Sequence, residues 1–101
     1  EAAQLPDNAE LQYRYGLSLY QIGEEDKATE VLARAHELAP GNVDILLPLA
    51  LLYKKRQQWD EALEATSRLI QLQPENEMFK HILRETLQER QQAESMPKDE
   101  E

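Results

Sequence analysis

The chain of 101 residues contains no cysteine, which excludes disulfide bonds, thiol chemistry and cysteine-ligated zinc but leaves the cellular compartment open. It has only three glycines, and isoleucine and valine are scarce beside leucine, alanine, glutamate and glutamine. That composition favours helices over strands. No apolar run approaches the roughly 20 residues that a helix needs to span a bilayer. The sequence therefore predicts one small helical domain with a thin core.

Positive charge is also in short supply. Lysine and arginine number 11 against 20 acidic residues, which gives a formal net charge of −9. The one basic cluster is Lys54-Lys55-Arg56. Binding to nucleic acid or to an anionic membrane needs clustered cations, so the sequence predicts neither kind of partner and no membrane insertion.

A period of 34 residues is the strongest positive feature. In each period a proline ends one helix, because it lacks an N–H group and clashes with the preceding turn. Two residues later an asparagine can accept a hydrogen bond from the free N–H groups of the next helix. This pair of signals occurs at Pro6 and Asn8, at Pro40 and Asn42, and at Pro74 and Asn76.

Between these signals, apolar residues recur every three or four positions, which predicts two helices in each period. Breaks near Gly23 and near Gln57-Gln58 separate the helices within a period. The predicted helices cover residues 9–21, 26–38, 43–55, 59–72 and 77–94. Helices joined by such short turns pack as antiparallel pairs, and stacked pairs bury a continuous core that none could bury alone.

The period and the residue types at fixed positions resemble the tetratricopeptide repeat family, over roughly residues 1–88. The resemblance implies an all-α solenoid of antiparallel helix pairs. Gln12, Thr66 and Leu69 depart from the family pattern, in which these positions hold an aromatic, a large apolar and a small residue respectively. The positions that match are Gly16, Leu19, Ala28, Ala35 and Pro40 in the first unit, and Ala50, Tyr53, Ala62, Leu69 and Pro74 in the second.

We expect two complete repeat units and a capping helix. Residues 1–8 read as the end of a truncated preceding repeat with its turn, which suggests a fragment of a larger protein. The units cover 9–42 and 43–76. Residues 77–94 form the capping helix, because Arg84 occupies the position of Gly16 and Ala50, where a close helix would need a small residue. Residues 95–101 are expected to be a disordered acidic tail.

No catalytic set is visible, so the sequence does not predict an enzyme or a cofactor. Glu77, His81 and Glu85 are spaced by four and could share one helix face, a spacing that can hold a metal ion. We interpret them instead as a solvated acidic face and predict no metal site. His36 is interpreted as a packing residue on the return helix, the second helix of its unit.

The resemblance implies that a protein or peptide partner binds the concave face, where the first helices of successive units lie side by side. The apolar middle of this groove suits a contact site. The predicted groove residues are Tyr13, Leu17, Tyr20, Gln21, Asp44, Leu47, Pro48, Leu51, Lys54, Lys55, Met78 and His81.

Two further expectations concern the partner. Family members that bind chaperone tails clamp a carboxylate with Lys, Asn and Arg, but the matching positions here are Tyr13, Leu17, Pro48, Met78 and Ile82, so no carboxylate-clamp chaperone tail is expected. Two readings compete with partner binding: a homo-oligomer in which a second copy covers the strip, and a structural spacer within a larger, possibly bacterial, multidomain protein.

Pro48 raises a separate question, because a proline normally damages a helix interior. The 34-residue register places the helix start at Val43, so that Pro48 lies in the second turn. Its missing N–H would have bonded the carbonyl of Asp44. Two readings remain open: a tolerated kink, or a carbonyl left free at the groove for a ligand.

Overall fold

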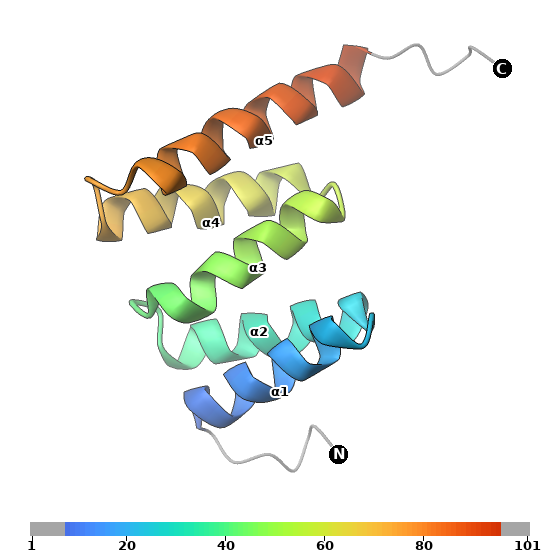
Figure 1. The fold of residues 1–101 in the computed structure, drawn as a ribbon, viewed down its shortest axis with the longest axis vertical. Helices are drawn as coiled ribbons and strands as arrows, with labels where there is room; N and C mark the ends of the chain where they lie inside the picture. The colour runs from blue at the N-terminus through green and yellow to red at the C-terminus, as the bar shows by residue number, and fades with distance from the viewer. Residues whose placement is uncertain (1–7, 96–101) are drawn as a thin grey trace, which may run out of the picture.

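The computed structural model describes residues 8–95; the predictions for residues 1–7 and 96–101 lie outside them. In this range the chain forms helices α1 (Ala9–Gln21), α2 (Glu25–Leu38), α3 (Val43–Lys55), α4 (Trp59–Leu72) and α5 (Glu77–Ser95) (Figure 1). The predicted all-α solenoid is confirmed. The predicted and observed helix bounds differ by at most one residue at each end, at the start of α2 and at the end of α5.

The three asparagines cap the first helices as their spacing predicts. The Asn8 side chain accepts from the backbone N–H of Glu10, and Asn42 accepts from that of Asp44, both at 2.9 Å. Asn76 does the same for α5. Each cap satisfies an N–H group that the helix itself leaves without a partner, so the local sequence fixes where α1, α3 and α5 begin.

The turns inside the two units also match each other. Gly23 and Gln57, which are 34 residues apart, both have a positive φ, of 89° and 62°. A left-handed residue lets the chain reverse after a helix, and glycine adopts it at little cost. The second unit makes the same turn with glutamine.

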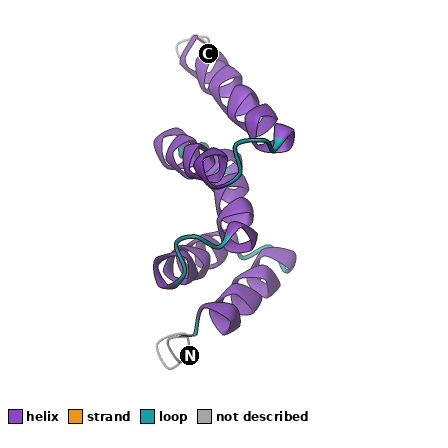
Figure 2. Ribbon diagram, turned by 90° about the vertical axis from the view of Figure 1, so that its left-hand side faces the viewer, coloured by secondary structure: helices purple, strands orange, loops and turns teal. Residues whose placement is uncertain are grey.

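The helices form two layers. Figure 2 shows α2 and α4 on one side of α1, α3 and α5. Each helix packs mainly against its neighbours in sequence, as expected for a stack of repeats. We call the exposed surface of α1, α3 and α5 the first-helix face and that of α2 and α4 the return-helix face.

The core lies between these layers, and α3 is its centre. This helix buries five residues, and each large apolar side chain removed from water contributes about 1.5–3 kcal/mol to folding. The five are Ile45, Leu46, Leu49, Ala50 and Leu52. Pro48 lies inside α3 and is half-buried, so the helix tolerates the proline as the register predicts.

Two departures from the repeat pattern have a clear place in the core. Thr66 is fully buried and donates its hydroxyl to the carbonyl of Ala62 at 2.7 Å, so no polar group is left unsatisfied there. Gly16 packs against Leu32: a Cβ added at Gly16 would lie 2.7 Å from Leu32 Cγ. Arg84, at the same position in α5, is exposed.

Candidate functional site

The predicted groove residues form rows across the first-helix face. Residues 34 apart occupy the same position on α1, α3 and α5. The rows change in character along the stack: α1 offers apolar side chains, α3 is mixed and α5 is polar. The three rows are Tyr13, Leu47 and His81; Leu17, Leu51 and Glu85; Tyr20, Lys54 and Gln88.

The apolar part of this face is accessible. Tyr20 and Leu51 are 40% and 39% exposed, although both are large hydrophobic side chains. Tyr13 and Leu47 are half-buried and pack against the core. Leu17 is half-buried as well. We call these five residues the apolar strip.

Lys54 closes the strip on the side of α5. Its Nζ lies 2.7 Å from Glu85 Oε1 and 3.8 Å from Glu89 Oε2. The Lys54 side chain is only 17% exposed. Glu85 also lies 3.2 Å from His81 Nε2. The hydrogen bond from Lys54, the charge of Lys54 and then His81 keep the pKa of Glu85 below its ordinary value.

Lys55 occupies the end of the strip near α1. Its ammonium pairs with Glu25 and lies 5.8 Å from the centre of the Tyr20 ring. The hydrogen bond to Glu25 raises the pKa of Lys55. Arg56, the next residue, pairs with Asp26 at the start of α2. The basic cluster of the sequence is therefore divided among ion pairs within the chain.

The other predicted groove residues lie away from these contacts. Asp44 and Met78 are exposed in the first turns of α3 and α5, at the ends opposite to Lys54 and the C-terminal part of α5. Gln21 is exposed at the last residue of α1. The structure thus brings Tyr20, Lys54 and Lys55 into one contact region, whereas Asp44 and Met78 belong to the far end of the face.

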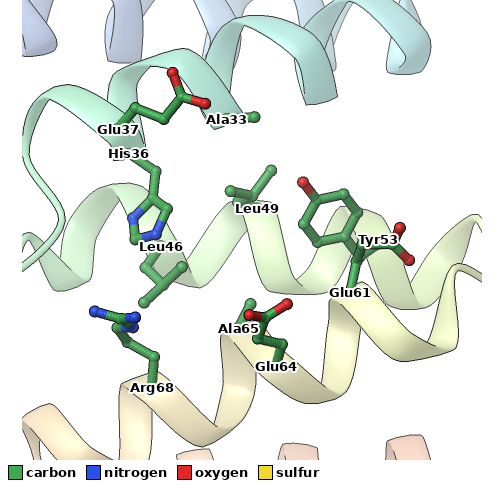
Figure 3. A pocket seen from close by; sticks show the side chains of 10 residues that line it. All are labelled: Ala33, His36, Glu37, Leu46, Leu49, Tyr53, Glu61, Glu64, Ala65 and Arg68. Atoms are coloured by element: carbon green, nitrogen blue, oxygen red, sulfur yellow. The ribbon is translucent and has the colours of Figure 1, made fainter.

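A second concave feature lies on the opposite side of the molecule, and the sequence analysis missed it. Figure 3 shows a hollow of about 210 Å³ between α2 and α4, with α3 beneath it. We call it the return-helix hollow. It is lined by Ala33, His36, Glu37, Leu46, Leu49, Tyr53, Glu61, Glu64, Ala65 and Arg68.

Two residues in the hollow break the repeat and could have signalled it. Tyr53 has Leu19 and Leu87 as its counterparts 34 residues away, and His36 has Ile70. Burial, followed by the charges of Glu61 and Glu64, raises the pKa of Tyr53, so its phenol stays protonated. Burial first, and Arg68 second, lower the pKa of His36. His36 is therefore a neutral imidazole at pH 7, and its Nδ1 has no hydrogen-bond partner among residues 8–95.

Neither face of the described chain carries a metal site or a membrane segment. Within residues 8–95, no three acidic or histidine side chains are grouped so that they could hold a metal ion. In the same range, no helix combines the length and the hydropathy that a membrane crossing needs.

The family model of the tetratricopeptide repeat matches residues 23–86, more than half of the chain. The chain belongs to the tetratricopeptide repeat family. Such repeats generally act as non-enzymatic scaffolds that bind other proteins. The match spans α2, α3, α4 and the first half of α5, so it includes both residues of the Lys54–Glu85 pair and the entire return-helix hollow.

Known proteins similar to this repeat chain come from distant organisms. Sperm-associated antigen 1 of Mus musculus is 38% identical over 58 residues, and that of Rattus norvegicus is 36% identical over 67. These stretches are 57% and 66% of this chain but only 6% and 8% of those proteins.

A solved structure supports the fold independently. The solution structure of a tetratricopeptide repeat domain protein from Salinibacter ruber superposes with a TM-score of 0.61. It is 18% identical in sequence, and the superposition covers 97% of this chain and 98% of that one. At this identity the likeness shows the fold alone.

Proposed function

We propose that this chain is a protein-interaction module that binds an extended peptide or a helix of a partner on its first-helix face. The observation that carries the proposal is the apolar strip on α1 and α3. Solvent-exposed apolar side chains gathered on one face of a soluble domain are typical of a contact site. Tyrosine and leucine of this strip can each bury substantial apolar area when a partner covers them.

The ion pairs define which part of the face is used. Lys54 is held by Glu85 and Glu89, and Lys55 is held by Glu25, so neither lysine is free to pair with a partner without losing a contact. The partner's apolar side chains therefore meet α1 and α3, whereas the polar row on α5 forms the rim. This places the main contact at Tyr13, Leu17 and Leu51.

The test uses two leucines with the same exposed fraction. Leu51 on α3 and Leu72 on α4 are both 39% exposed, but only Leu51 belongs to the apolar strip. Peptides selected from a random display library for binding to the folded chain serve as probes, and their affinity is measured by calorimetry. We expect Leu51→Ala to weaken binding about tenfold or more, because a central apolar contact is worth more than 1 kcal/mol.

Leu72→Ala is the matched control and should leave the affinity unchanged. Tyr13→Ala should act like Leu51→Ala. Thermal unfolding of each variant verifies that the fold persists. If Leu72→Ala weakens binding while Leu51→Ala and Tyr13→Ala do not, the partner lies on the return-helix face and the proposal is wrong.

A further inference from the structure

The return-helix hollow combines an apolar floor with a charged wall. Leu46, Leu49 and Ala65 form the floor and are each less than 10% exposed. The ring of Tyr53 forms one end (Figure 3). A floor of this kind favours the aliphatic part of a ligand, because contact removes apolar surface from water.

Negative charge predominates around this floor. Three carboxylates, those of Glu37, Glu61 and Glu64, line the hollow together with one guanidinium, that of Arg68. With His36 neutral, the formal charge is three negative and one positive, or −2. A cation that enters meets a favourable field.

None of these four charged side chains is engaged elsewhere. Every ion pair between residues 8–95 involves other groups, including all three members of the basic cluster. An arriving cation could therefore pair with Glu61 or Glu64 without displacing a contact already made within the described chain.

The volume limits what can bind. The hollow measures about 210 Å³. Pockets that hold a drug-sized small molecule usually measure about 300–1,000 Å³. The return-helix hollow therefore suits a single side chain of a larger partner better than a complete cofactor.

From these observations we infer that the return-helix hollow binds one arginine or lysine side chain of a protein partner. The aliphatic stem of that side chain lies on Leu46, Leu49 and Ala65. Its cationic head contacts the face of Tyr53 and pairs with Glu61 and Glu64. Aromatic rings and carboxylates both attract such a head group, and the apolar floor excludes water from around it.

Arg68 gives the hollow a direction. Figure 3 shows Arg68 and His36 at the end opposite to Tyr53 and Glu61. A cation at the Arg68 end is repelled, so the head group enters with its charge toward Tyr53. The five N–H groups of the Arg68 guanidinium are then available to donate to a main-chain carbonyl of the partner. This site is separate from the apolar strip and does not depend on it.

The experiment titrates the chain with N-acetyl-arginine methylamide and, in parallel, with N-acetyl-citrulline methylamide. Citrulline has nearly the same shape as arginine but no charge. Amide chemical shifts are followed by NMR. We expect the arginine probe to move the signals of Leu49, Tyr53 and Ala65 and to leave those of Tyr13 and Leu17 unmoved. The citrulline probe should move none of them.

Variants separate a specific site from general attraction to an acidic protein. Glu61→Gln with Glu64→Gln should weaken arginine binding about tenfold, since two partly exposed ion pairs are lost. Glu24→Gln with Glu30→Gln changes the net charge equally at exposed positions outside the hollow and should have no effect. Tyr53→Leu copies Leu19 and Leu87 and should retain the fold while weakening the arginine probe.

Three results would overturn the inference. Equal shifts with arginine and citrulline would show that charge plays no role. An equal loss of affinity in the two double variants would show unspecific attraction. Shifts confined to Tyr13 and Leu17 would place the cation on the first-helix face instead.

Discussion

At the scale of single residues, the pair Gly16 and Leu32 shows how closely α1 and α2 approach. Leu32 is fully buried, and a Cβ on residue 16 would lie 2.7 and 2.8 Å from its Cγ and Cδ2. The 34-residue register gives Ala50 and Thr66 as the corresponding residues of the second unit. A smaller partner at position 66 leaves room for the larger residue at position 50.

This pair yields a double-mutant prediction. Gly16→Ala should destabilise the fold by about 1 kcal/mol, because overpacking by about 1–3 kcal/mol exceeds the helix propensity that alanine adds. In a Leu32→Thr background, which copies Thr66, the same change should be neutral or stabilising. Urea unfolding followed by circular dichroism measures all four chains. A destabilisation of equal size in both backgrounds would show that Leu32 is not the obstacle.

His36 gives a prediction for pH. Its pKa is lowered from 6.5 in the folded chain, mainly by burial and then by Arg68. The unfolded chain therefore binds the proton more tightly. Stability that is present above pH 6.5 should be lost as the pH falls from 6.5 through the lower pKa of the folded state.

The measurement compares unfolding midpoints at about pH 7.5 and about pH 5.5 in the wild type and in His36→Ile, which copies Ile70. The wild type should lose more stability than the variant over this interval. His81→Gln serves as the control and should leave the difference in place. The same pH dependence in the wild type and in His36→Ile would contradict the prediction.

At the scale of helices, α3 carries the one proline inside a described helix, Pro48. Proline lacks the N–H that would bond the carbonyl of Asp44, and proline in a helix interior costs about 3 kcal/mol relative to alanine. Pro48 follows soon after the first turn, so the cost should be smaller here. Pro48→Ala should stabilise the fold by about 1–2 kcal/mol, as judged from urea unfolding.

Binding of the display-selected peptides decides between the two readings of this proline. If it only kinks α3, Pro48→Ala leaves their affinity intact. If the carbonyl of Asp44 serves the groove, the variant is more stable and binds more weakly. A loss of stability would instead mean that packing of the half-buried proline ring outweighs the lost hydrogen bond.

The helices were predictable because their signals are local. Asn8, Asn42 and Asn76 cap within three residues of themselves, and a proline stop acts on its own turn. The site was less predictable. Lys54 and Glu85 are 31 residues apart, and the sequence offers no sign that Lys54 would pair with α5 rather than with a partner. Ion pairs between helices depend on how the helices cross.

At the scale of the whole molecule, the two faces differ in the kind of partner they suit. The first-helix face presents the apolar strip, and the return-helix face presents an acidic hollow. The described chain is thin, at 47 × 37 × 18 Å, so both faces lie close to the same core. A partner that wraps around α3 and α4 could use both at once.

The net charge of −9 leads to a prediction about self-association. Like charges oppose the approach of two copies, and the apolar strip is interrupted by internal ion pairs. Light scattering after size exclusion should therefore give the mass of one chain from micromolar to sub-millimolar concentration. A mass that rises with concentration, and that Leu51→Glu returns to one chain, would favour the homo-oligomer over a module for other proteins.

The sequence by itself determined the helices, their order and the repeat, because caps, stops and apolar spacing act over a few residues or recur at a fixed period. It also marked the apolar strip, since residues 34 apart occupy equivalent positions on stacked helices. Only the tertiary structure decided that the basic cluster is spent on Glu85, Glu25 and Asp26, and that α2 and α4 leave a hollow above α3. Both depend on distances between helices, which no local pattern encodes.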